Sequence, residues 1–107
     1  MITFTANIYV GLKEGYEGPT HTFDGARFII REYVSSIGLC VTITPTEFWY
    51  VNGNEPGIIV GLINYPRFPT TPQRIKDMAI ELGYQLKDAF KQQRISIVCT
   101  DETIMLE

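Results

Sequence analysis

The chain has 107 residues, of which 45% are hydrophobic, 12% aromatic and 20% charged, and its formal net charge is −3. This length predicts one domain spanning residues 1–107, and the apolar share is too high for a disordered chain. The negative net charge and the scattered Lys and Arg residues argue against a nucleic-acid partner. No apolar run approaches the roughly 20 residues that cross a bilayer, and no signal peptide is recognisable, so we expect no membrane partner and a cytoplasmic location.

The first half of the chain predicts a strand, a loop and a helix. Residues 3–12 alternate between apolar and polar types, which is typical of a strand with one face in the core. Residues 13–21 contain Gly and Pro and predict a loop that can close over a ligand. An apolar repeat at three and four residues in the segment 26–37 predicts an amphipathic helix, and Gly38 follows as its expected end.

The middle of the chain predicts a β-hairpin. Residues 39–44 are β-branched and alternating, Pro45 is expected to interrupt the strand, and the aromatic stretch 47–51 resumes it at a sheet edge. The dipeptide Asn52-Gly53 is typical of a two-residue hairpin turn, since both residues tolerate positive φ. The apolar segment 58–63 then predicts a central strand.

The last third predicts a long helix and a final strand. Thr71 and Pro72 provide a cap and a first helical residue, residues 94–99 form a strand, and residues 103–106 form either an edge strand or an arm to a neighbouring subunit. The resulting order, β-α-β-β-α-β, is that of a ferredoxin-like α+β fold with an antiparallel sheet and two helices on one face. The other face is apolar enough that we expect a homo-oligomer packed sheet to sheet, with three subunits as the expected number.

Two cysteines, Cys40 and Cys99, lie in apolar, strand-like runs. We expect both side chains to be buried as small hydrophobic residues and to form no disulfide. The single histidine, His21, has no Cys or His at a zinc-ligand spacing, so we expect no metal and no cofactor. The glycine-rich segment 11–18 lacks the Gly-Lys-Ser/Thr ending of a phosphate loop, and its two glutamates would repel phosphate.

The candidate ligand-binding residues surround the central hairpin and the end of the long helix. Tyr50 and Glu55, the candidate catalytic residues, flank the turn, where a carboxylate can hold an ammonium and a phenol can donate a hydrogen bond or stack on a cation. Gln93 lies at the junction of the long helix and the last strand, and Tyr16 and His21 belong to the glycine-rich loop. The alternative for the hairpin is an ordinary polar turn, and for Gln93 a helix cap.

Three short patches carry a resemblance to a known family: Val10-Gly11-Leu12, the hairpin with Tyr50 and Glu55 before Ile58-Ile59-Val60, and the segment 90–97. Together with the element order, they resemble the small phage proteins that degrade S-adenosylmethionine, which have a PII-like, ferredoxin-type fold and assemble as trimers. The resemblance implies a lyase that releases methylthioadenosine and homoserine lactone, in which the substrate's own carboxylate attacks the carbon next to the sulfonium. The ligand would lie between subunits.

In that family's pattern, Glu55 matches the carboxylate before the central strand, Tyr50 the tyrosine preceding it, and Gln93 the glutamine after the second helix. The segment between Tyr50 and Glu55 is shorter than in the family, which leaves open whether the two side chains converge on one ligand.

Two other functions fit the same pattern. A noncatalytic PII-like module would bind or sequester a nucleotide-like small molecule at subunit interfaces and retain it unaltered. A protein-interaction domain would use the aromatic edge 48–50 and lose its partner on Trp49→Ala.

Overall fold

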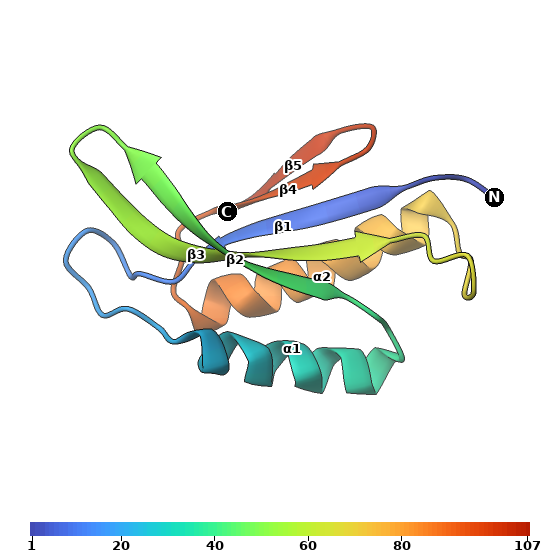
Figure 1. Cartoon of the computed structure of the whole chain (residues 1–107), viewed down its shortest axis with the longest axis horizontal. Coiled ribbons are helices and arrows are strands. Elements are labelled where there is room, and N and C mark those ends of the chain that lie inside the picture. Colours follow the sequence, from blue (N-terminus) through green and yellow to red (C-terminus); the bar gives the residue numbers. More distant parts are fainter.

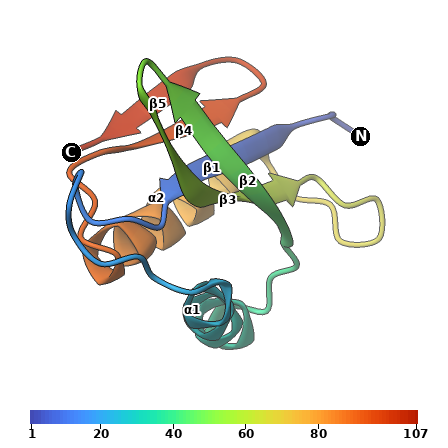
Figure 2. The same ribbon diagram turned by 60° about the vertical axis from the view of Figure 1, so that its left-hand side comes forward.

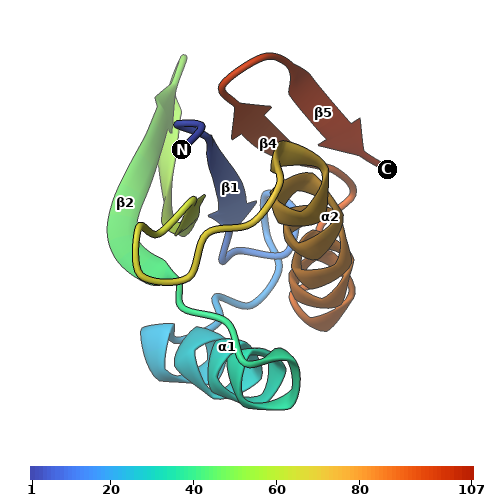
Figure 3. The same cartoon turned by 90° about the vertical axis from the view of Figure 1, so that its right-hand side faces the viewer.

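The computed structural model describes all 107 residues and contains five strands and two helices. The strands are β1 (Thr5–Gly11), β2 (Thr42–Tyr50), β3 (Gly53–Ile63), β4 (Ile95–Cys99) and β5 (Thr103–Leu106), and the helices are α1 (Phe23–Ile37) and α2 (Pro72–Ala89). Figures 1 and 3 show both helices on one side of the sheet. The predicted α+β, ferredoxin-like fold is therefore confirmed.

The sheet has the order β2-β3-β1-β4-β5, and all neighbouring strands are antiparallel. Its first four strands have the order of the ferredoxin-like layout. The fifth strand, β5, pairs with β4, so residues 103–106 form an edge strand within this chain and not an arm. The edge strand was one of the two alternatives that the sequence left open for residues 103–106, and it extends the four-strand order by one.

The core lies between the sheet and the two helices. Ala6, Ile8 and Val10 of β1 point into it and are completely buried, as are the residues of β3 and α2 that complete the same layer: Ile58, Val60, Ala79, Leu82 and Leu86. The period of two in β1 and the helical period in α2 place these side chains on facing surfaces. The alternation in the sequence therefore identified the buried face correctly.

Both helices begin at threonine caps. The Thr22 and Thr71 hydroxyl oxygens accept hydrogen bonds from the backbone N–H groups of Gly25 (3.0 Å) and Arg74 (3.1 Å). Helix α1 ends at Gly38, whose φ of 76° is the left-handed conformation that glycine adopts at little cost. The start of α2 at Thr71 and the end of α1 at Gly38 that the sequence predicted are confirmed.

Three local expectations for the hairpin region were wrong. Pro45 does not interrupt β2, because β2 is an edge strand and a missing N–H there breaks no ladder. Strand β3 begins at Gly53 instead of residue 58, which makes the hairpin longer. Tyr50 pairs with Gly53, so the turn residues are Val51 and Asn52, and of these only Asn52 has positive φ (65°).

The two cysteines differ in environment. Cys99 is buried in β4, as predicted, and burial raises the pKa of its thiol. Cys40 is exposed and precedes β2, which corrects the expectation of a second buried strand cysteine. Neither forms a disulfide.

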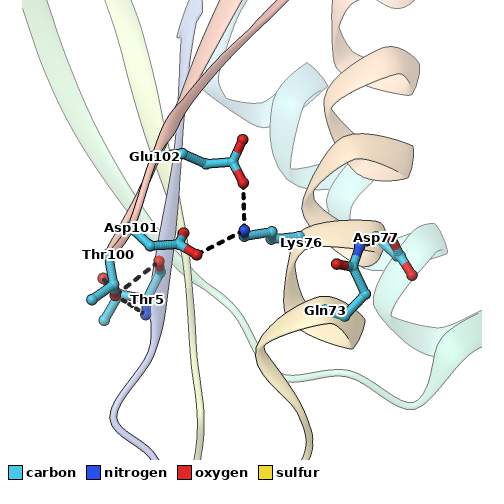
Figure 4. A network of polar contacts seen from close by, with 7 residues as sticks. All are labelled: Thr5, Gln73, Lys76, Asp77, Thr100, Asp101 and Glu102. Atoms are coloured by element: carbon cyan, nitrogen blue, oxygen red, sulfur yellow. Dashed lines mark hydrogen bonds and ion pairs between the residues drawn. The ribbon is translucent and has the colours of Figure 1, made fainter.

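A polar network fixes the β4–β5 turn to α2 (Figure 4). The Lys76 ammonium donates hydrogen bonds to the carboxylates of Asp101 (2.9 Å) and Glu102, which raises the pKa of Lys76 above its ordinary value. Beside it, the Thr100 hydroxyl accepts a hydrogen bond from the Thr5 backbone N–H at 2.8 Å. These contacts tie the outer hairpin to the central strand and the helix.

Neither helix has the length and apolar composition that crossing a membrane would require.

Tyr33 joins the two helices and makes stability sensitive to alkaline pH. Its buried hydroxyl donates a hydrogen bond to the Met78 carbonyl oxygen (3.3 Å), and burial raises its pKa to about 12. Between pH 10 and 12 the unfolded chain loses this proton and the folded chain keeps it, so the free energy of unfolding falls by up to about 1.4 kcal/mol per pH unit.

We expect Tyr33→Phe to lessen this alkaline loss of stability, because phenylalanine has no proton to lose. Urea unfolding between pH 9 and 12 measures the effect as the slope of unfolding free energy against pH. Equal slopes in the two proteins would contradict the prediction, whatever the difference in their stability at neutral pH.

Candidate functional site

Three segments distant in sequence meet at one end of the molecule, where β1 ends. They are the tip of the β2–β3 hairpin, the loop of residues 12–22 and the C-terminal end of α2, and Figures 1 and 2 show how they gather there. They enclose a pocket of about 360 Å³, a volume within the range of small-molecule sites. Its lining consists of Lys13, Gly15, Tyr16, Tyr50, Glu55, Lys91, Gln92, Gln93 and Arg94.

The hairpin supplies Tyr50 and Glu55 to this pocket. Tyr50 pairs with Gly53 across the turn, and a methyl group on Gly53 would overlap the Tyr50 ring, so the glycine lets the ring lie against the strand. The Tyr16 ring from the loop meets the Tyr50 ring edge to face, with 6.3 Å between centroids. Both tyrosines and Glu55 therefore line the same pocket despite the short segment between Tyr50 and Glu55.

The end of α2 supplies two glutamines. After Phe90 the chain turns at Lys91, which has a left-handed φ of 51°, and the backbone N–H of Gln92 returns to the Lys87 carbonyl oxygen (2.9 Å). The side-chain amide nitrogen of Gln92 donates to the carbonyl oxygens of Lys13 (2.9 Å) and Phe90 (3.1 Å). These two bonds fix the amide, and both Gln92 and Gln93 line the pocket.

Gly11 brings two acceptor oxygens together. A methyl group built on Gly11 would lie 2.7 Å from Oε1 of Glu55 and 2.7 Å from Oε1 of Gln92. Both oxygens therefore reach the same small space above the Gly11 backbone, and neither accepts a hydrogen bond from the protein. Two unpaired acceptors, one of them charged, form a site for a cationic donor such as an ammonium group.

The charges around the pocket suit a ligand with both signs. Glu55 is the one carboxylate in the lining, and Lys13, Lys91 and Arg94 are cations. An amino-acid group carries an ammonium and a carboxylate, so it finds a partner for each here. The tyrosine rings of residues 16 and 50 add an aromatic surface on which a heterocycle or a sulfonium can stack.

The loop is fixed at its base and exposed at its tip. Lys13 bridges to Thr20, and Nε2 of His21 lies 2.7 Å from a carboxylate oxygen of Glu14. The His21 ring also packs beside Phe90, with 4.9 Å between centroids. His21 therefore lies outside the pocket lining, and its contacts with Glu14 and Phe90 hold the base of the loop. Tyr16, at the tip of the loop, is 82% exposed and lines the pocket.

Sequence reasoning placed Tyr50, Glu55, Gln93, Tyr16 and His21 in the site. The first four line the pocket, and His21 does not, because its ring pairs with Glu14 and packs beside Phe90. Sequence reasoning missed Gln92 and Gly11. The pair Gln92-Gln93 follows the helix, and only the left-handed turn at Lys91 shows that the amide of Gln92 is the one fixed against Lys13. The sequence did contain a signal for Gly11, since a glycine ends an otherwise regular strand. The structure adds that this glycine pairs with Gly57 of β3.

The fold and the pocket define a small ferredoxin-like domain with a polar pocket at one end of its sheet. Two solved structures share this fold over nearly the whole chain. One, of a phage SAM lyase in the apo state, has 17% sequence identity and a TM-score of 0.81, and the match covers 96% of this chain and 87% of that one. The other, of a phage SAM lyase in complex with S-methyl-5'-thioadenosine, has 19% identity and a TM-score of 0.79, covering 97% and 88%.

No protein-family model and no curated protein matches the sequence. The structural similarity confirms, at the level of the fold, the resemblance to the phage SAM lyases that the sequence suggested.

Proposed function

We propose that this protein is an S-adenosylmethionine lyase that releases methylthioadenosine and homoserine lactone. The observation that carries the proposal is the pair of unpaired acceptor oxygens, from Glu55 and Gln92, which meet above Gly11 beside the aromatic Tyr50. The fold that the chain shares with the phage SAM lyases also supports the proposal. One of those lyases was solved in complex with S-methyl-5'-thioadenosine, the nucleoside product of the proposed reaction.

In the proposed reaction the substrate supplies its own nucleophile. A carboxylate oxygen of the methionyl group forms a bond to the carbon next to the sulfonium, the carbon–sulfur bond breaks, and its electron pair stays on sulfur. The products are neutral methylthioadenosine and homoserine lactone, whose ammonium group keeps its proton. The reaction needs no protein nucleophile and no proton transfer, so the protein contributes positioning.

The pocket residues have distinct roles in this proposal. Glu55 and Gln92 hold the ammonium, whose charge does not change during the reaction, and so orient the methionyl chain for ring closure. Tyr50 and Tyr16 stack on the adenosine or the sulfonium. Lys13, Lys91 and Arg94 attract the carboxylate end of the substrate into the pocket.

Incubating purified protein with S-adenosylmethionine and following the mixture by liquid chromatography and mass spectrometry tests the function. We expect methylthioadenosine and homoserine lactone in equal amounts, well above the spontaneous rate. Unchanged substrate that stays bound would instead identify a noncatalytic binding module and would refute the lyase.

We further propose that the protein acts as a trimer with the site between subunits. Three apolar side chains on the helix-free face of the sheet are exposed: Ile63 (42%), Val98 (39%) and Met105 (54%). The register places Glu55 and Tyr50 on this same face. Packing sheet to sheet would cover the apolar side chains and close the open side of the pocket, which would exclude water from the reacting charges.

Val98→Lys should separate the subunits, because it places a charge at the centre of the proposed interface. We expect a mass of three times 12.2 kDa for the natural protein by light scattering, a smaller species for the variant, and loss of lyase activity with it. Tyr84→Lys is the matched control, since Tyr84 is exposed on α2 and lies on the helical side. A natural protein that is monomeric at micromolar concentration would contradict the trimer.

We propose that the protein acts in the cytoplasm, which is that of the host if a phage encodes it. Reducing compartments such as the cytoplasm keep cysteines as free thiols, and both Cys40 and Cys99 are free.

A further inference from the structure

A second hollow, of about 390 Å³, lies at the opposite end of the molecule from the candidate site. It is formed where α1 ends, where the connector between β3 and α2 turns, and where α2 begins, at the right-hand end of Figure 1. Nine of its twelve lining residues are hydrophobic, and those that shape it are Leu39, Tyr65, Phe68, Ile75 and Met78. Its apolar lining distinguishes it from the polar candidate site.

The walls of this hollow are held in place by hydrogen bonds within the connector and to the N-terminal segment. Asn64 is 7% exposed, its amide nitrogen donates to the Ile2 carbonyl oxygen (2.7 Å), and its amide oxygen accepts from the Thr70 backbone N–H (2.9 Å). The Phe68 N–H also donates to the Tyr65 carbonyl oxygen (3.0 Å). The connector is therefore fixed at both ends, and the hollow exists without a ligand.

One charged side chain, Arg74, lines the hollow, and no acidic residue does. The Arg74 guanidinium forms no ion pair and no hydrogen bond in the chain, in contrast to Arg27, which pairs with Asp24 (3.3 Å). An unpaired guanidinium at the edge of an apolar hollow is complementary to an anionic head group on an apolar chain, since it can form two parallel hydrogen bonds with a carboxylate or a phosphate.

We propose that this hollow binds an amphipathic anion, with the alkyl chain among Leu39, Phe68 and Met78 and the anionic head group on Arg74. Carboxylate and phosphate head groups share the required chemistry. The inference rests on the second hollow alone and is independent of the lyase proposal.

Titration with decanoate, decyl phosphate and decanol, each below its micelle-forming concentration and followed by NMR of the Ile and Met methyl groups, tests this. We expect saturable shifts of the Met78 and Ile75 methyl signals with an anionic ligand. Tighter binding of decanoate or of decyl phosphate shows which head group the site prefers. Equal binding of decanol, or shifts spread over other methyl groups, would overturn the proposal.

Arg74→Gln should weaken binding of the anionic ligand at least about tenfold and leave decanol unaffected, because only the charged head group loses its partner. Arg31→Gln, which removes an exposed arginine of α1 outside this hollow, is the matched control and should bind as the natural protein does. Equal affinities in Arg74→Gln and the natural protein would refute the role of Arg74. Shifts confined to the Met78 and Ile75 methyl signals that depend on protein concentration without ligand would show that a second copy fills the hollow, and would also overturn the proposal.

Discussion

Glu55→Gln should lower kcat/KM for S-adenosylmethionine roughly 10- to 150-fold while leaving the fold intact. The loss corresponds to the 1.5–3 kcal/mol typical of a hydrogen bond to a charged group. In the proposed complex the Glu55 carboxylate holds the substrate ammonium together with the Gln92 amide oxygen. Glutamine keeps the size of the side chain and removes its charge, so the change isolates the electrostatic contribution.

Stability should not fall in this variant, because Glu55 forms no ion pair or hydrogen bond within the chain that the substitution would break. Methylthioadenosine release and thermal unfolding, measured on the same preparation, check both parts. Glu47→Gln is the matched control: Glu47 is an exposed carboxylate of the same hairpin, its register places it on the other face of the sheet, and it lies outside the pocket. If Glu55→Gln turns over S-adenosylmethionine as fast as the natural protein does, Glu55 does not contribute to the site.

Gly11→Ala should abolish most of the activity and leave the protein folded. The added methyl group would lie 2.7 Å from both Glu55 Oε1 and Gln92 Oε1, in the space that we assign to the substrate ammonium. Misplacing a reacting group by about 1 Å costs on the order of 100-fold in rate, and we expect a loss of at least that size.

The backbone at Gly11 tolerates alanine, because its φ is not positive. Alanine restricts the unfolded chain more than glycine does, which stabilises the protein by about 0.4–1 kcal/mol. Moving the Gln92 amide away from the methyl group gives up its hydrogen bonds to Lys13 and Phe90, at about 0.5–1.5 kcal/mol each, so we expect a net loss of at most about 3 kcal/mol. Urea unfolding and the product assay together separate this result from simple misfolding. Gly25→Ala, in the first turn of α1 and outside the pocket lining, should keep full activity. An active Gly11→Ala variant would show that the substrate does not occupy this space.

These two variants also distinguish the candidate functions. A binding module without catalysis would lose retention of S-adenosylmethionine in both variants and would form no product in either. A protein-interaction domain would show no stabilisation by S-adenosylmethionine, and both variants would capture a partner as well as the natural chain, because the aromatic edge that contains Trp49 is unchanged. Trp49 is 71% exposed, so its availability for a partner is not in question.

The sequence by itself determined which helices and strands form and which of their faces are buried, because both follow from local patterns, whereas it misplaced the hairpin turn and the start of β3. Alternation predicted β1, the helical repeat predicted α1 and α2, and Asn52-Gly53 predicted the β2–β3 hairpin to within one residue of its turn. The same locality placed Tyr50 and Glu55 together, since a hairpin brings residues on either side of its turn to one end of the sheet.

The tertiary structure alone decided how the segments combine. The register of β3 against β1 sets Gly11 beside Glu55, and the left-handed turn at Lys91 sets Gln92 against Lys13, 79 residues earlier in the chain. The unpaired Arg74 and the apolar hollow beside it likewise depend on the connector that Asn64 fixes. Such contacts depend on side chains that approach from distant segments, and no spacing in the sequence records that approach.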